Sequence, residues 1–138
     1  MAKILVLEAD KILAGNLSRY LRNSGHSVTW SSGPQEAIEQ TDKNQPDVIV
    51  TDLVLGEHSG VEFLYELRSY PEWQDLPVII LSTIAYNDLA STGHSLKELN
   101  IAEFYYKSET SLPEIAKAID LLSQPLQSPA GLGTRTAR

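Results

Sequence analysis

Five short runs of apolar residues, separated by stretches with helical patterns, constrain the fold of this chain more than any other feature. They occupy residues 4–7, 26–30, 46–52, 77–81 and 103–106. The third and fourth runs are almost continuously apolar or β-branched, which is typical of strands that are covered on both faces. The second run is more polar and is expected near an edge of the sheet. The pattern predicts a parallel β-sheet with helices packed on both sides.

Helical patterns fill the intervals between these runs. In the first interval Leu13, Leu17 and Leu21 recur every four residues, Asp10 precedes the stripe as a helix cap, and Gly25 follows it as a helix end. The other intervals predict helices from residue 34, from residue 60, over 84–100 and from about residue 111. Five strands that alternate with five helices indicate a flavodoxin-like (βα)5 fold with three layers and the strand order 2-1-3-4-5.

Length and composition are those of one soluble domain. The chain has 138 residues and a formal net charge of −7, which argues against binding to nucleic acid or to an anionic membrane. It contains no cysteine, so disulfides and thiolate chemistry are excluded. The start lacks the pattern of a signal peptide, and a cytoplasmic location is expected. Residues 1–123 are predicted to form the domain, and 124–138 a flexible tail or linker because they are rich in proline and glycine.

Polar side chains follow four of the predicted strands. Glu8 and Asp10 follow the first strand, Asp52 the third, Ser82 the fourth and Lys107 the fifth. The carboxyl ends of parallel strands meet at one edge of the sheet, so these groups are expected to converge. Carboxylates attract a hard cation such as Mg²⁺, while a hydroxyl and an ammonium can bind phosphoryl oxygens. The pattern favours nucleophilic attack by Asp52 on phosphorus, which would give an aspartyl phosphate.

The chain resembles the receiver domains of response regulators, the phospho-accepting modules of two-component signalling. The resemblance extends from residue 3 to about 122, and its matching pieces are residues 4–8, 47–53, 60–62, 77–82 and 104–107. It implies that Asp52 is the phosphoacceptor, Ser82 the hydroxyl switch residue and Lys107 the phosphoryl-binding lysine. It also implies that Phe104 is the aromatic residue that reports the phosphorylated state.

The chain departs from this family in its acidic cluster. Receivers usually carry two adjacent acids after the first strand, and the second binds Mg²⁺ directly, but here that position is Ala9. By the resemblance, Mg²⁺ would depend on Asp52, the Val54 carbonyl and Glu8, with Asp10 as a partial substitute. Because a methyl group cannot ligate a metal, weak Mg²⁺ binding is expected.

The remaining candidates have simpler interpretations. His26 is expected at the surface or in a loop, and Trp30 and Trp73 are expected to pack in the core. A partner-binding face is expected on the fourth helix, fifth strand and fifth helix. Its candidate residues are Leu96, Leu99, Tyr105 and Tyr106.

Three functions are compatible with these residues. The first is a receiver that takes a phosphoryl group from a histidine kinase or phosphotransfer protein and signals to a downstream protein or an output domain outside this sequence; it is not expected to be an enzyme. The second is a degenerate receiver that acts by protein interaction without phosphorylation, which Ala9 and Ser108 (where the family has proline) suggest. The third, a flavodoxin-like enzyme that binds a nucleotide or flavin, is disfavoured because the loops lack phosphate-wrapping glycines.

Overall fold

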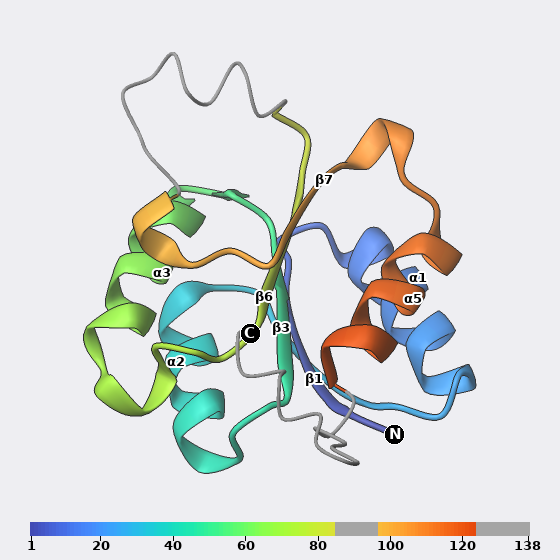
Figure 1. The fold of residues 1–138 in the computed structure, drawn as a ribbon. Helices are drawn as coiled ribbons and strands as arrows, with labels where there is room; N and C mark the ends of the chain where they lie inside the picture. The colour runs from blue at the N-terminus through green and yellow to red at the C-terminus, as the bar shows by residue number, and fades with distance from the viewer. Residues whose placement is uncertain (85–96, 124–138) are drawn as a thin grey trace.

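The computed structural model describes residues 1–84 and 97–123, and its centre is a five-stranded parallel sheet (Figure 1). The strands of this sheet are β1 (Lys3–Leu7), β2 (Ser27–Ser31), β3 (Val48–Thr51), β6 (Val78–Ser82) and β7 (Glu103–Tyr106). Their order is β2-β1-β3-β6-β7, and each neighbouring pair is parallel. The predicted order 2-1-3-4-5 is confirmed, since β6 and β7 are the fourth and fifth strands of this sheet along the chain. The strand β2 lies at an edge, as its polar sequence indicates.

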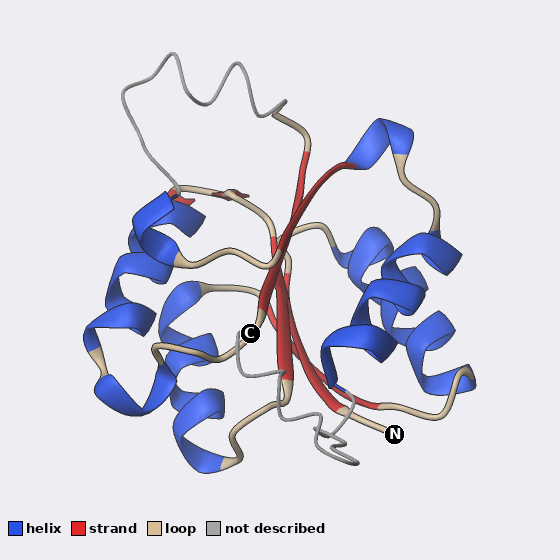
Figure 2. Ribbon diagram, in the orientation of Figure 1, coloured by secondary structure: helices blue, strands red, loops and turns tan. Residues whose placement is uncertain are grey.

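Helices cover both faces of the sheet (Figure 2). The α-helices are α1 (Lys11–Asn23), α2 (Pro34–Lys43), α3 (Gly60–Ser69) and α5 (Leu112–Ser123), and the 3₁₀ turns are η1 (Pro71–Trp73), η2 (Lys97–Leu99) and η3 (Lys107–Glu109). The pair α1 and α5 lies on one side of the sheet and the pair α2 and α3 on the other (Figure 1). Most of the predicted helix over 84–100, and the predicted tail 124–138, lie outside the described residues.

The strands build two apolar layers because successive side chains point to opposite faces. In β1, Ile4 and Val6 join the cluster under α1 and α5, whereas Leu5 and Leu7 join the cluster under α2 and α3. The central strands β3 and β6 alternate in the same way and are buried throughout. This double burial explains why their sequences are continuously apolar, as the sequence analysis predicted.

Local signals set the ends of the helices next to the carboxyl edge. The Oδ1 atom of Asp10 accepts hydrogen bonds from the N–H groups of Ile12 and Leu13 and so caps α1, as predicted. The segment after Asp52 forms a short antiparallel hairpin of β4 (Val54–Leu55) and β5 (His58–Ser59).

The positions of two residues differ in part or in full from the prediction. His26 was expected at the surface or in a loop; it does lie in the loop between α1 and β2, but it is only 8% exposed, with the Ala2 N–H donating to its Nδ1 and Asp120 Oδ1 lying 2.9 Å from its Nε2. Leu99 was expected on a partner-binding face, but it is 1% exposed and packs in the cluster under α2 and α3. Leu96 lies outside the described residues.

Candidate functional site

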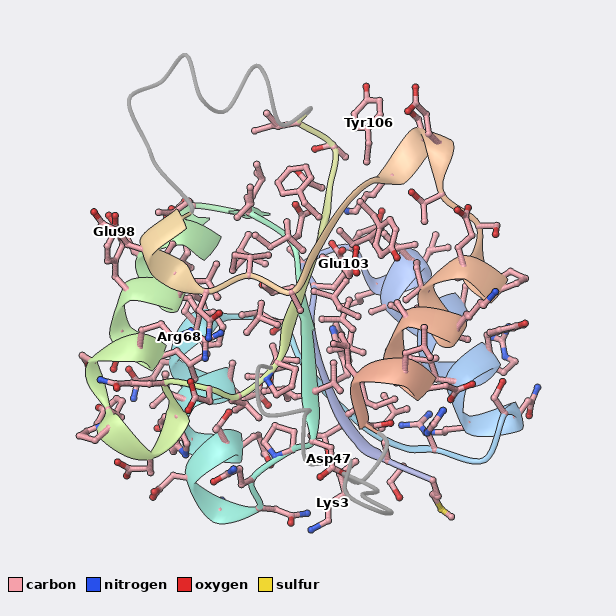
Figure 3. The ribbon with its side chains drawn as sticks, viewed as in Figure 1. Lys3, Asp47, Arg68, Glu98, Glu103 and Tyr106 are labelled. Carbon is pink, nitrogen blue, oxygen red and sulfur yellow. The ribbon has the colours of Figure 1, made fainter. Side chains whose placement is uncertain are left out.

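Three charged side chains meet where β1, β3 and β7 end. The Nζ atom of Lys107 lies 2.7 Å from Asp52 Oδ2 and 3.0 Å from Glu8 Oε1. Asp52 and Glu8 are 4% and 5% exposed, and the Lys107 side chain is 16% exposed. The residue before Lys107, Tyr106, lies at the upper end of the sheet, opposite Lys3 and Asp47 at the lower end (Figure 3). The predicted convergence of Glu8, Asp52 and Lys107 at the carboxyl edge is therefore observed.

The backbone holds one oxygen of the Asp52 carboxylate in place. Asp52 directly follows β3, and its Oδ1 accepts hydrogen bonds from the N–H groups of Leu53 at 2.6 Å and Val54 at 3.2 Å. Two backbone donors on one carboxylate oxygen fix the orientation of the group. The other oxygen, Oδ2, is turned towards the Lys107 ammonium.

Gly60 is the residue against which the backbone of Asp52 packs. A methyl group on Gly60 would overlap the Asp52 carbonyl oxygen and lie 2.7 Å from the Leu53 Cα atom. The Gly60 N–H also donates to the Leu53 carbonyl at 2.9 Å. The first residue of α3 must therefore be a glycine if the chain is to turn closely behind the Asp52 carboxylate.

Glu8 is held by the loop that begins after β1. Its Oε2 accepts a hydrogen bond from the Asp10 N–H at 3.0 Å, and its carbonyl oxygen accepts one from Trp30 Nε1 at 2.8 Å. Trp30 was expected to be only a packing residue; it does pack against the cluster under α1 and α5, but it also makes this polar contact. An indole nitrogen donating to a backbone carbonyl leaves no pattern in the sequence, so sequence reasoning could not identify it.

The two carboxylates determine the charge state of Lys107. Burial by itself lowers the pKa of the Lys107 ammonium, but its hydrogen bonds to Asp52 and Glu8 and their negative charges outweigh burial and raise that pKa. Lys107 is therefore protonated at neutral pH. Together with two ionised carboxylates it gives the cluster one net negative charge.

Ser82 lies at the same edge of the sheet. It ends β6, is fully buried, and pairs in register with Tyr106, the residue before Lys107. Its Oγ accepts a hydrogen bond from the Ile84 N–H at 2.8 Å. Phe104 is partly buried and packs against the cluster under α2 and α3.

Oxygen ligands suit Mg²⁺, but the arrangement of these residues does not complete a site for it. Glu8 and Asp52 already share the Lys107 ammonium, and Asp10 uses Oδ1 to cap α1. Within residues 1–84 and 97–123, no group of three or more acidic or histidine side chains is placed to hold a metal. In this arrangement the residues do not fit Mg²⁺, so the ligand set of Glu8, Asp10, Asp52 and the Val54 carbonyl stays a prediction.

Comparison with known families identifies the type of domain. The family described as response regulator receiver domain matches residues 4–120. The chain belongs to this family.

Individual receiver-containing proteins are similar over part of their length. The chain is 35% identical over 79 residues to a probable transcriptional regulatory protein, TcrX, of Mycobacterium tuberculosis, and this match covers 57% of the chain and 33% of TcrX. It is 22% identical over 120 residues to the transcriptional regulatory protein PdtaR of the same species, covering 86% of the chain and 55% of PdtaR. The matches to TcrX and to the response regulator MprA of several mycobacteria cover about a third of those curated relatives.

Solved structures of receivers share the fold. A response regulator receiver domain protein from Clostridium thermocellum is similar with a TM-score of 0.74 and 26% identity, over 89% of this chain and 94% of that one. The chemotaxis protein CheY4 of Vibrio cholerae has a TM-score of 0.77 at 21% identity, over 88% of this chain and 98% of that one. The second likeness supports the fold alone. Of the helices in the described part of this receiver, none is long and apolar enough to span a membrane.

Proposed function

We propose that this receiver accepts a phosphoryl group on Asp52 from the phosphohistidine of a histidine kinase or phosphotransfer protein. The observation that carries this proposal is the contact of Asp52 Oδ2 with the Lys107 ammonium at 2.7 Å, while two backbone N–H groups hold Oδ1. A buried carboxylate held in this way has one oriented oxygen and a cation beside it. Attack on phosphorus needs both features, whereas a purely structural ion pair would not need the oriented oxygen.

In the proposed step an oxygen of Asp52 forms a bond to phosphorus as the bond from phosphorus to the donor imidazole nitrogen breaks. The imidazole leaves with the electron pair of that bond and takes a proton from solvent. Because Oδ2 is the oxygen next to Lys107, attack through Oδ2 brings the phosphoryl oxygens towards the ammonium. The domain receives the group and passes on a signal, and we assign it no further catalytic activity.

Ser82 supplies the link from phosphorylation to shape in this proposal. Its Oγ accepts a hydrogen bond from the Ile84 N–H, so the hydroxyl hydrogen is still available to donate to a phosphoryl oxygen. Turning Ser82 towards the phosphoryl group would change the chain direction after β6. The side chains of Tyr105 and Tyr106 on β7 are partly buried and lie on the proposed partner-binding face, together with α5. The downstream partner is a protein or an output domain outside this sequence.

The direct test is mass spectrometry of the intact protein after incubation with acetyl phosphate and Mg²⁺. We expect a mass gain of one phosphoryl group, which Asp52→Asn abolishes. Asp52→Asn keeps the shape of the side chain and removes the nucleophilic charge, so it is the matched control. If the wild-type chain gains no mass under conditions that label another receiver, phosphorylation is wrong and the domain acts as a phosphorylation-independent interaction module.

A further inference from the structure

Trp30 connects an edge strand to the loop that carries Glu8. Its indole Nε1 donates a hydrogen bond of 2.8 Å to the Glu8 carbonyl oxygen, and its ring packs against the cluster under α1 and α5. The backbone N–H of Glu8 donates in turn to the Ser31 carbonyl at 3.1 Å. Both main-chain polar groups of Glu8 are thus bound by residues at the end of β2.

These contacts matter because the next residue offers none through its side chain. Ala9 is exposed and carries only a methyl group, and the Asp10 carboxylate is directed to the start of α1 through Oδ1. The orientation of Glu8 therefore depends on its own backbone. Trp30 fixes the Glu8 carbonyl, and the Asp10 N–H fixes the Glu8 carboxylate through Oε2.

We propose that Trp30 is a positioning residue for the Glu8–Lys107–Asp52 cluster, acting through its hydrogen bond to the Glu8 carbonyl. Glu8 takes one side of the Lys107 ammonium at 3.0 Å and Asp52 the other at 2.7 Å. If the Glu8 carbonyl lost the Trp30 donor, the bonds of the Glu8 N–H to Ser31 and of the Asp10 N–H to Oε2 would remain, but the Glu8 carboxylate would be held less tightly beside Lys107. The place of the ammonium beside Asp52 Oδ2 would then be less defined. The link to phosphorylation rests on the proposed function of Asp52, whereas the positioning itself does not.

The alternative hypothesis is that Trp30 has only a packing role. If the ring only fills space against α1 and α5, an aromatic ring without the N–H should serve equally well. The two hypotheses can be separated by removing the indole N–H of Trp30 while keeping the volume of its ring. Replacing Trp30 with benzothienylalanine, in which sulfur takes the place of the indole N–H, does this with little change of shape. Trp30→Phe is the simpler variant, and Trp73→Phe is the control because Trp73 is buried on the opposite face of the sheet.

The first measurement is the NMR signal of the Lys107 ammonium and of the Glu8 carboxylate carbon in the unphosphorylated protein. We expect both signals to shift in the benzothienylalanine protein and in Trp30→Phe, and to stay at their wild-type positions in Trp73→Phe. The second measurement is the rate of labelling by acetyl phosphate. We expect it to fall about tenfold in both Trp30 variants, which is typical when a residue that orients a reactive group is lost.

The outcomes separate this proposal from the proposed function. If the benzothienylalanine protein keeps both NMR signals and the wild-type labelling rate, Trp30 is a packing residue and the positioning role is wrong. If the wild-type protein is never labelled, the phosphoacceptor role fails, and the NMR signals alone decide the role of Trp30. If Trp30→Phe is too unstable to study, the benzothienylalanine protein carries the test, because its ring fills the same volume.

Discussion

Within the described residues, two partly buried cations have surroundings that are opposite in kind. Lys107, at the carboxyl edge, is bound by two carboxylates. Arg68, on α3, is bound by backbone carbonyls: its Nε, Nη1 and Nη2 donate to Leu99 at 2.8 Å, Trp73 at 2.6 Å and Asn100 at 3.0 Å. Burial lowers the pKa of the Arg68 guanidinium, with Asp75 opposing it, whereas the anions around Lys107 raise the pKa of that ammonium.

The difference separates a cation that holds backbone segments together from a cation that lies in the candidate site. The planar guanidinium of Arg68 divides its donors among three separate carbonyls and joins α3 to the segment before β7 and to η1 (Figure 3). These three backbone carbonyls carry no net charge and are already bonded to the guanidinium. Lys107 is instead bound by two carboxylates, and either of them can release the ammonium to bind another group. The Lys107 ammonium sits on a flexible side chain and can move with such an exchange of partners. The planar guanidinium of Arg68, fixed by three hydrogen bonds, cannot.

Arg68→Met should give the largest loss of stability. It leaves three backbone carbonyls without their charged donor, and we expect the free energy of unfolding to fall by about 3 kcal/mol. The atoms that Arg68 binds belong to Leu99, Trp73 and Asn100 and not to the charged cluster, so the folded fraction should still be labelled by acetyl phosphate at the wild-type rate. Urea unfolding followed by circular dichroism measures the free energy of unfolding, and intact-protein mass measures the labelling.

Arg68→Lys is the control, because an ammonium keeps the charge but cannot reach all three carbonyls in the same geometry. A labelling rate that falls in proportion to stability in both variants would show that the two regions are not separate.

Gly60→Ala should affect the site directly. The added methyl group overlaps the Asp52 carbonyl oxygen, so the backbone behind the carboxylate has to move. We expect a loss of about 2 kcal/mol in the free energy of unfolding and a loss of most labelling in the protein that remains folded. Gly15→Ala on α1 is the matched control, because a methyl group there meets nothing within 4 Å. If Gly60→Ala is labelled like the wild type, the close packing of α3 on Asp52 has no bearing on its reactivity.

Lys107→Met should cost less stability than Arg68→Met, and its cost should depend on pH. We expect a loss of about 1.5 kcal/mol at neutral pH, since hydrogen bonds to charged partners disappear. Because the pKa of Lys107 is raised in the folded state, its contribution is complete below the unfolded value, about 10.4, and is lost as pH rises through the folded value.

The check is the difference in unfolding free energy between wild type and Lys107→Met as pH is raised. That difference should be constant below about pH 10 and shrink above it. The corresponding difference for Arg68→Met should stay constant over the same range, since the guanidinium remains charged. Equal pH dependence in the two variants would contradict the contrast between the two cations.

The same contrast explains what the sequence could and could not predict. Glu8, Asp52 and Lys107 each follow an apolar run, so a parallel sheet brings them to one edge whatever the details of the loops. Their meeting follows from the periodicity of the strands, and it is confirmed by the contacts of Lys107 with both acids.

Contacts made to backbone atoms have no such signature. Arg68 and the Leu99 carbonyl are 31 residues apart, and any residue at position 99 would supply the same acceptor. Trp30 binds the carbonyl of Glu8 in the same way. The loop position of His26 was predicted but its burial was not, because its partners, the Ala2 N–H and Asp120, cannot be identified from its neighbours in sequence; Asp120 is 94 residues away. Ser82 was found because it ends a strand, but its hydrogen bond to the Ile84 N–H is visible only in the structure.

Ala9→Asp should have the smallest effect on stability and a clear effect on cation binding. It adds a third carboxylate beside Glu8, and mutual repulsion should lower the free energy of unfolding by about 0.5 kcal/mol. The cluster would then carry two net negative charges instead of one, which increases its attraction for a divalent cation. We therefore expect Mg²⁺ affinity to rise about tenfold and labelling by acetyl phosphate to rise with it.

Trp30 provides the measurement for Ala9→Asp, because its indole is bonded to the Glu8 carbonyl and should sense a cation at the neighbouring carboxylates. Titrating Mg²⁺ against tryptophan fluorescence in a Trp73→Phe background gives the affinity, and Ala9→Asn controls for side-chain size without charge. The Asp variant should bind more tightly than both the wild type and the Asn variant. If all three proteins bind Mg²⁺ alike, the missing acid at position 9 is not what limits the site. The ammonium of Lys107, held between Glu8 and Asp52, would then be the barrier that a metal ion has to overcome.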